Sequence, residues 1–264
     1  MESEDGLRWR TIARVPTDNR GPAYAGDPTL MRWRDQWWLT HQYSSVGRTR
    51  FTLRSSPDLR SWSKVTEVDP QVPGTVEVYP GTWARNEDGS VHTDPRDGRP
   101  RLFLSLTTGD IGLGPFVLHE LRPLEDEMTA WSAAIPVPGG FPANVIDPWV
   151  QRRGNTWFCW YKANDWGQEV IEVAASDRLA GPWHSYRSGD WAGWGRRCEA
   201  PCLVRLPGDR WRIYLQRYRR HTAGVWCSES TDGWETWSRL VPLVADLDRD
   251  DHLSHGDVLY LPER

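Results

Sequence analysis

The chain has 264 residues and a formal net charge of −4, with arginines scattered along its length and no polybasic run. This charge excludes the basic footprint of a nucleic-acid-binding or membrane-surface protein. Its apolar stretches are only a few residues long, far too short to span a bilayer. The first residues are acidic and lack the apolar core of a signal peptide, so we expect a cytoplasmic protein, or a secreted one if a leader precedes this sequence.

The composition favours an all-β protein. The chain contains 18 tryptophans, 23 glycines and 20 prolines, which suit short strands joined by turns and make poor helices. It has four cysteines, too few for a disulfide scaffold in a chain of this length, and they lack the spacing of a zinc site. We therefore expect buried free thiols.

Two kinds of strand-like segment alternate along the chain. One places a polar turn before an aromatic strand, at 32–40, 98–106, 154–162 and 208–216. The other is centred on a tryptophan, at 7–15, 60–68, 129–137, 181–189 and 235–243. The five central tryptophans, 52 to 69 residues apart, are Trp9, Trp62, Trp131, Trp183 and Trp237. This period in an all-β sequence predicts four-stranded propeller blades.

Five repeats predict a five-bladed β-propeller that forms a single domain over residues 1–264. The first tryptophan segment comes before any inner strand of its own, so it should be the outer strand of the last blade. Ring closure of this kind removes a free sheet edge. The last blade, formed by about 251–264 together with 7–15, has little material between these strands and is expected to be reduced.

Acidic residues stand at the start of several predicted inner strands. Reading back from each hairpin places Asp27 in "AGDPTL", Asp147 in "VIDPWV" and Glu199 in "CEAPCL", while His255 lies in "SHGDVL". Inner strands line the central channel of a propeller, so their first residues should meet at one end of it. We predict that the three carboxyls occupy equivalent positions and form one composite site.

These motifs, in this order and at blade-length spacing, resemble glycoside hydrolase family 43 over about residues 22–260. The resemblance implies an inverting five-bladed glycosidase with Asp27 as general base, Asp147 as the aspartate that tunes the pKa of the acid, and Glu199 as general acid. It further implies that His255 touches a water or a calcium ion in the channel, and that no cofactor is required.

The predicted chemistry follows from the carboxyl pair. Inverting hydrolysis needs a protonated acid at the leaving oxygen and an ionised base that activates water. Apolar neighbours and facing carboxylates should raise the pKa of Glu199 and keep its proton available. Aromatic side chains pack on the apolar faces of sugars. The candidate substrate-binding residues are Trp83, Trp149, Trp166, Trp194 and Arg217.

Several functions stay open at this point. The resemblance favours an α-L-arabinofuranosidase or β-xylosidase acting on plant-type oligosaccharides. Alternatives are a neoagarobiose-type or galactoside hydrolase, a retaining fructosidase that uses Asp27 as nucleophile, and a non-catalytic sugar-binding propeller. A lectin should repeat one pocket in each blade, whereas here the starts of the inner strands differ from blade to blade. The expected partner is an oligosaccharide or glycoside, with neither nucleic acid nor membrane, and the sequence leaves the oligomeric state open.

Overall fold

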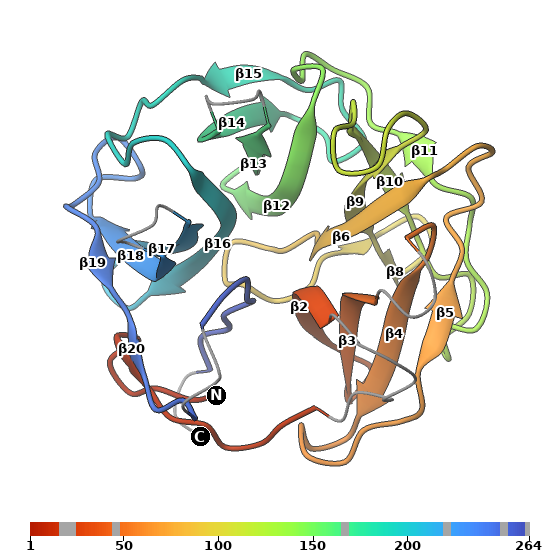
Figure 1. Cartoon of the computed structure of the whole chain (residues 1–264), viewed down its shortest axis with the longest axis horizontal. Coiled ribbons are helices and arrows are strands. Elements are labelled where there is room, and N and C mark those ends of the chain that lie inside the picture. The colour runs from red at the N-terminus through yellow and green to blue at the C-terminus, as the bar shows by residue number, and fades with distance from the viewer. Residues whose placement is uncertain (16–24, 44–47, 165–168, 219–222, 249–252, 262–264) are drawn as a thin grey trace.

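The computed structural model describes residues 1–264 except 16–24, 44–47, 165–168, 219–222, 249–252 and 262–264. Four antiparallel four-stranded sheets stand around a centre (Figure 1). In order from the innermost strand outward, the first two sheets are β2 (Ala25–Trp33), β3 (Gln36–Tyr43), β4 (Phe51–Ser56), β5 (Thr66–Val68), and β6 (Glu77–Trp83), β9 (Leu102–Thr107), β10 (Val117–Leu121), β11 (Ile135–Pro136). The next two are β12 (Val145–Arg153), β13 (Thr156–Ala163), β14 (Val170–Ser176), β15 (His184–Arg187), and β16 (Cys198–Leu206), β17 (Arg210–Arg217), β18 (Gly224–Ser230), β19 (Val241–Pro242). The protein is an all-β propeller.

Three of the four predicted hairpins are confirmed. The inner strands β2, β12 and β16 each turn into an antiparallel partner through two or three residues at the start of the aromatic segment. In the second blade β6 and β9 pair antiparallel, but residues 84–101 separate them, so the tight hairpin expected at 98–106 is wrong. β12 and β16 have the same residue-by-residue burial pattern, as expected of equivalent strands in two blades. The outer strands begin at or shortly after the repeat tryptophans, and β15 follows Trp183 directly. In the second blade, a small hairpin of β7 (Thr93–Asp94) and β8 (Arg99–Pro100) lies in the chain between β6 and β9.

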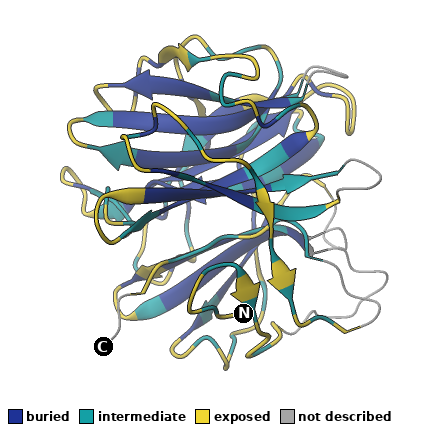
Figure 2. Cartoon of the chain, turned by 90° about the vertical axis from the view of Figure 1, so that its left-hand side faces the viewer, coloured by how far each residue is buried: buried dark blue, intermediate teal, exposed yellow. Residues whose placement is uncertain are grey.

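The core lies between neighbouring blades. Buried residues fill the strands, and exposed residues lie mainly in the connections (Figure 2). Three apolar clusters join the first blade to the second, the second to the third, and the third to the fourth. All four cysteines are buried free thiols, as predicted. Among the described residues there is no helix, and hence none that could cross a membrane.

The part of the ring between the fourth and the first blade differs from the expected ring closure. The N-terminal strand β1 (Arg8–Trp9) pairs in parallel with β20 (Val244–Ala245) and not with 255–262. Residues 253–261 form no strand. They lie between β16 and β2, near the centre, where the blue chain is drawn in Figure 1. Local patterns show which segments are extended, but the pairing of two segments more than 200 residues apart depends on tertiary packing.

Candidate active site

Three inner strands share a bulge just before a proline. The bulged residues are Asp27, Asp147 and Ala200, with φ angles of 50°, 54° and 52°. The pairing with the second strand of each blade shifts at this point. A positive φ costs an L-residue on the order of 1–2 kcal/mol, and a following proline restricts the backbone further. Bulges re-aim side chains, and such strain gathers at functional sites.

Glu199 does not occupy the position that Asp27 and Asp147 share. Ala200 takes the bulge in β16, and Glu199 stands one residue earlier, opposite Gln216 of β17. The prediction of three equivalent positions is therefore wrong in register. The side chain of Glu199 nevertheless reaches the same cluster, because His255 contacts it from the C-terminal segment.

A single imidazole ring joins two of the carboxyls. His255 Nδ1 bonds to Asp27 Oδ1, and its Nε2 lies 3.0 Å from Glu199 Oε1. Asp147 completes the group, since one oxygen of each aspartate and one ring nitrogen of His255 all lie within 4.8 Å of one another. Asp147 Oδ2 also accepts a hydrogen bond of 3.1 Å from the Ala200 backbone N–H. The structure thus brings the four predicted residues together.

Lys162 is the member of the cluster that the sequence reading missed. Its Nζ donates to Glu199 Oε2 at 2.8 Å and lies 5.0 Å from the centre of the Tyr218 ring. Its side chain is only 8% exposed, so this is a buried ion pair. A signal was available, because Lys162 ends an aromatic strand and the only other lysine of the chain is Lys64.

The electrostatics follow from these contacts. Burial raises the pKa of Asp147 to about 6, helped by the charges of Asp27 and Glu199 and opposed by His255. Burial would also raise the pKa of Glu199, but the hydrogen bond from His255 and the charge of Lys162 outweigh it and lower that pKa. Burial would lower the pKa of His255, but its bonds to Asp27 and Glu199 raise it to about 12.

The expectation that Glu199 holds a proton in the resting site is therefore wrong. The sequence showed its carboxylate neighbours but not the two cations that contact it. Three carboxyls face two cations, so the fully ionised cluster carries one net negative charge. The proton that neutralises it is held most readily by Asp147, whose pKa is raised.

The space between these groups is small. A cavity of about 40 Å³ is lined by Asp27, Asp147, Trp149, Ala200 and His255, among others. This volume exceeds the roughly 10–15 Å³ that one water needs. The cavity can therefore hold water beside the carboxyls of Asp27 and Asp147.

A second cavity, of about 230 Å³, is also lined by His255. Its walls include Trp9, Tyr214, Leu243 and Val258. His255 and Gly256 line both cavities, so the segment that carries His255 helps to close each of them.

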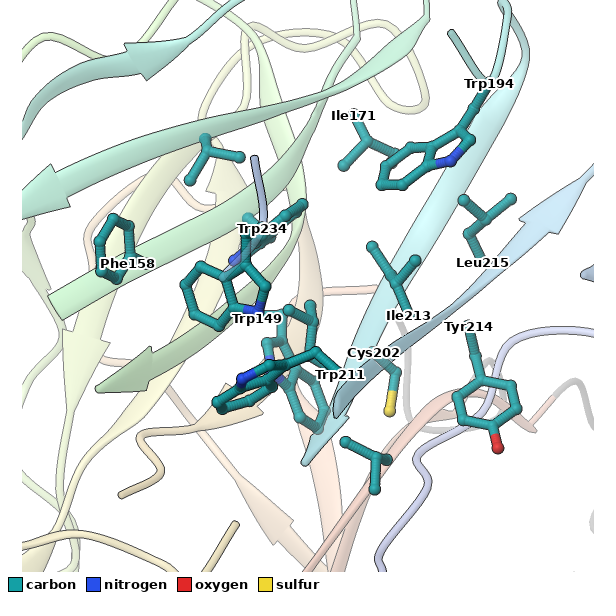
Figure 3. Packing of buried hydrophobic residues seen from close by; sticks show 14 of the residues in the cluster. Trp149, Phe158, Ile171, Trp194, Cys202, Trp211, Ile213, Tyr214, Leu215 and Trp234 are labelled. Atoms are coloured by element: carbon teal, nitrogen blue, oxygen red, sulfur yellow. The ribbon is translucent and has the colours of Figure 1, made fainter. Parts of the chain in front are cut away.

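The predicted substrate-binding residues differ in whether they lie at the site or in the core. Trp149 lines the small cavity. Trp83 is fully buried between the first two blades against Trp131, so its assignment to the channel is wrong. Trp194 is likewise buried, in the cluster with Ile171 and Leu215 shown in Figure 3, and is a core residue.

Of the two other candidates, only Arg217 can be placed. Arg217 lies over the ring of Trp226, 5.4 Å from its centre, and lines neither cavity. Trp166 falls outside the described residues.

The donor set can be tested against the calcium ion that the resemblance implies. Calcium takes roughly six to eight oxygen ligands. Asp27 and Asp147 offer carboxylates, but both ring nitrogens of His255 already bond to carboxylates, and a protonated imidazole has no lone pair to give. These residues do not fit a calcium ion, and the imidazolium itself supplies the positive charge between the carboxyls.

Glycoside hydrolases of known structure share this architecture. No protein-family model and no curated protein matches the sequence. The arabinanase of Bacillus subtilis superposes with a TM-score of 0.53 at 14% identity, over 79% of this chain and 75% of that one. A family 43 endo-arabinanase from Bacillus licheniformis gives 0.54 at 16%, over 87% and 77%.

A family 32 β-fructofuranosidase from Bombyx mori gives a TM-score of 0.59 at 15% identity, over 80% of this chain and 47% of that one. Identities this low establish the likeness of the fold alone. The chain therefore has a propeller fold like that of family 43 glycoside hydrolases.

Proposed function

We propose that the protein is a glycoside hydrolase whose catalytic groups are Asp27, Asp147 and Glu199. The observation that carries this proposal is the convergence of three carboxyls from three separate strands on one imidazole. Placing several carboxylates close together in a buried site costs free energy through their mutual repulsion. Such an arrangement is therefore expected where the shifted pKa values serve a reaction. The shared fold of the arabinanases and the fructofuranosidase adds support.

In the proposed reaction Asp27 is the general base. His255 holds its carboxylate in place, and the small cavity beside it has room for the water that Asp27 would activate. Glu199 is the general acid at the leaving oxygen. The side chain of Glu199 is 15% exposed, so a sugar bound against it would remove the remaining water, and loss of solvent favours its neutral form.

Asp147 is the proposed store of the proton that the site needs for catalysis. With its pKa raised to about 6, it binds the proton that neutralises the cluster. Its hydrogen bond to the Ala200 backbone fixes it beside Glu199. We infer that this carboxyl stores the proton that Glu199 delivers.

The substrate class that best fits is an α-L-arabinofuranoside or β-xyloside of plant-type oligosaccharides, because two of the structures that share the fold are arabinanases. We also infer a ring of five sectors, with four complete blades and a reduced fifth formed by the β1–β20 pair and residues 253–261. No cofactor or metal takes part in the proposed reaction.

The second candidate is a retaining fructosidase with Asp27 as nucleophile, because the family 32 propeller superposes as well as the arabinanases do. The test is a panel of aryl arabinofuranoside, xyloside, galactoside and fructoside substrates, assayed with the wild type and with Asp27→Asn. Turnover of at least one member, abolished in Asp27→Asn, supports the proposal. Inactivity on the whole panel and on the parent oligosaccharides contradicts it.

A further inference from the structure

Asp257, two residues after His255, gathers contacts from three blades. Its Oδ2 accepts from Thr29 Oγ1 at 3.1 Å, from the Leu30 N–H at 2.6 Å and from Arg85 Nη2 at 2.6 Å. Its Oδ1 accepts from the thiol of Cys202 at 3.8 Å. These partners belong to β2, to the chain just after β6, and to β16. One carboxylate thus joins the reduced sector to its neighbours on both sides of the ring and to the second blade.

The ion pair at the centre of these contacts is nearly dry. The side chains of Arg85 and Asp257 are 1% and 4% exposed. Arg85 also donates to the Leu30 carbonyl at 2.7 Å, and its guanidinium lies 4.7 Å from the centre of the Trp149 ring. A carboxylate so fully enclosed and hydrogen-bonded from several elements restrains the chain to which it belongs.

The segment that carries His255 has no sheet to hold it. Residues 253–261 form no strand, so ladder hydrogen bonds do not set their position. Apart from the bonds of His255 itself to Asp27 and Glu199, the segment is held by the contacts of Asp257 and by a 2.8 Å hydrogen bond from Ser254 to Gln216. The Val258 N–H adds a bond to Cys202. Two residues of chain span at most about 7 Å, so fixing Asp257 closely restricts where the ring of His255 can lie.

We propose that Asp257 is a positioning residue, which through Arg85, Thr29 and the Leu30 backbone holds the His255 ring between Asp27 and Glu199. This inference rests on the proposed hydrolase function for its kinetic consequence, but its structural consequence is independent of that function. A misplacement of about 1 Å can cost roughly 100-fold in rate. We therefore expect Asp257→Asn to lower kcat about 100-fold and to change KM little.

The experiment compares Asp257→Asn with a matched control, Asp94→Asn. Asp94 is also buried and pairs with a buried arginine, Arg101, at 2.9 Å, but it lies in the β7–β8 hairpin and contacts none of the site residues. A hydrogen-bonded ring N–H of His255 should give a downfield proton resonance, which is assigned by its absence in His255→Asn. Both variants are examined as folded protein, checked by near-ultraviolet circular dichroism.

The expected result is that Asp257→Asn loses or shifts this resonance and loses activity, while Asp94→Asn keeps both. A folded Asp257→Asn protein with an unchanged resonance and unchanged kcat overturns the proposal. If Asp257→Asn does not fold, Thr29→Val replaces it as the test variant, because it removes one hydrogen bond to Asp257 and keeps the ion pair with Arg85. A shift of the His255 resonance in Thr29→Val then supports the proposal, and an unchanged resonance contradicts it. If the wild type cleaves no glycoside, the hydrolase proposal fails while the resonance still tests the role of Asp257.

Discussion

Replacing Lys162 by methionine tests the electrostatics of the site, because it removes one cation and keeps most of the volume. Lys162 and Glu199 form a 2.8 Å pair whose side chains are 8% and 15% exposed. Removing one partner of a buried pair costs about 3–5 kcal/mol, since the other charge is left uncompensated. We expect the free energy of unfolding at pH 7.5 to fall by about that amount, and the pKa of Glu199 to rise.

The loss should depend on pH. The lowered pKa of Glu199 means that its ionised form stabilises the wild type above the unfolded pKa of about 4.3, and that this contribution disappears as pH falls through the folded pKa. In Lys162→Met the pKa of Glu199 is raised instead, so falling pH protonates Glu199 and removes its uncompensated buried charge. The difference between wild type and Lys162→Met should therefore shrink from pH 7.5 to pH 4. Urea unfolding followed by tryptophan fluorescence measures it, with the exposed Lys64→Met as control. A loss that is the same at both pH values, or no larger than that of Lys64→Met, would show that Lys162 does not stabilise the ionised form of Glu199.

Two further predictions concern the remaining members of the site and core. For substrates with poor leaving groups, kcat/KM should fall as pH rises through about 6, where Asp147 loses its proton, and this limb should be missing from the pH profile of Asp147→Asn; a wild-type profile that is flat from pH 5 to 8 would contradict the role of Asp147 as the proton store. Trp83→Ala should lower the free energy of unfolding by about 3–5 kcal/mol and leave kcat of the folded protein unchanged, because Trp83 is a core residue; a fall in kcat at constant stability would return it to the site.

Much of the fold could be predicted from local pattern. The polar turns before aromatic strands marked the hairpins between first and second strands in three blades, and the repeat tryptophans marked the outer strands, as Trp183 before β15 shows. Both signals arise within a few residues of chain. The parallel pairing of β1 with β20 has no such local signal, and it was not predicted.

The sequence predicted which acidic residues meet in the site better than it predicted their protonation states. Asp27, Asp147 and Glu199 could be placed near one another because blade repeats align the starts of inner strands. The protonation of Glu199 could not be predicted, because it depends on Lys162 from the neighbouring blade and on the ring of His255. Trp83 and Trp194 show the same limit, since a tryptophan beside a motif packs inward or outward according to contacts that one strand does not reveal.

In the proposed mechanism the carboxyl cluster cleaves glycosidic bonds with Asp27 as base and Glu199 as acid. The most direct measurement is proton NMR of the first-formed anomer during hydrolysis of an arabino-oligosaccharide or aryl glycoside by the wild type, with Asp27→Asn and Glu199→Gln run in parallel. We expect a product of inverted configuration from the wild type and none from Asp27→Asn. We also expect Glu199→Gln to act only on substrates whose leaving group departs without protonation. A product of retained configuration would contradict the role of Asp27 as base, and full activity in both variants would contradict the site itself.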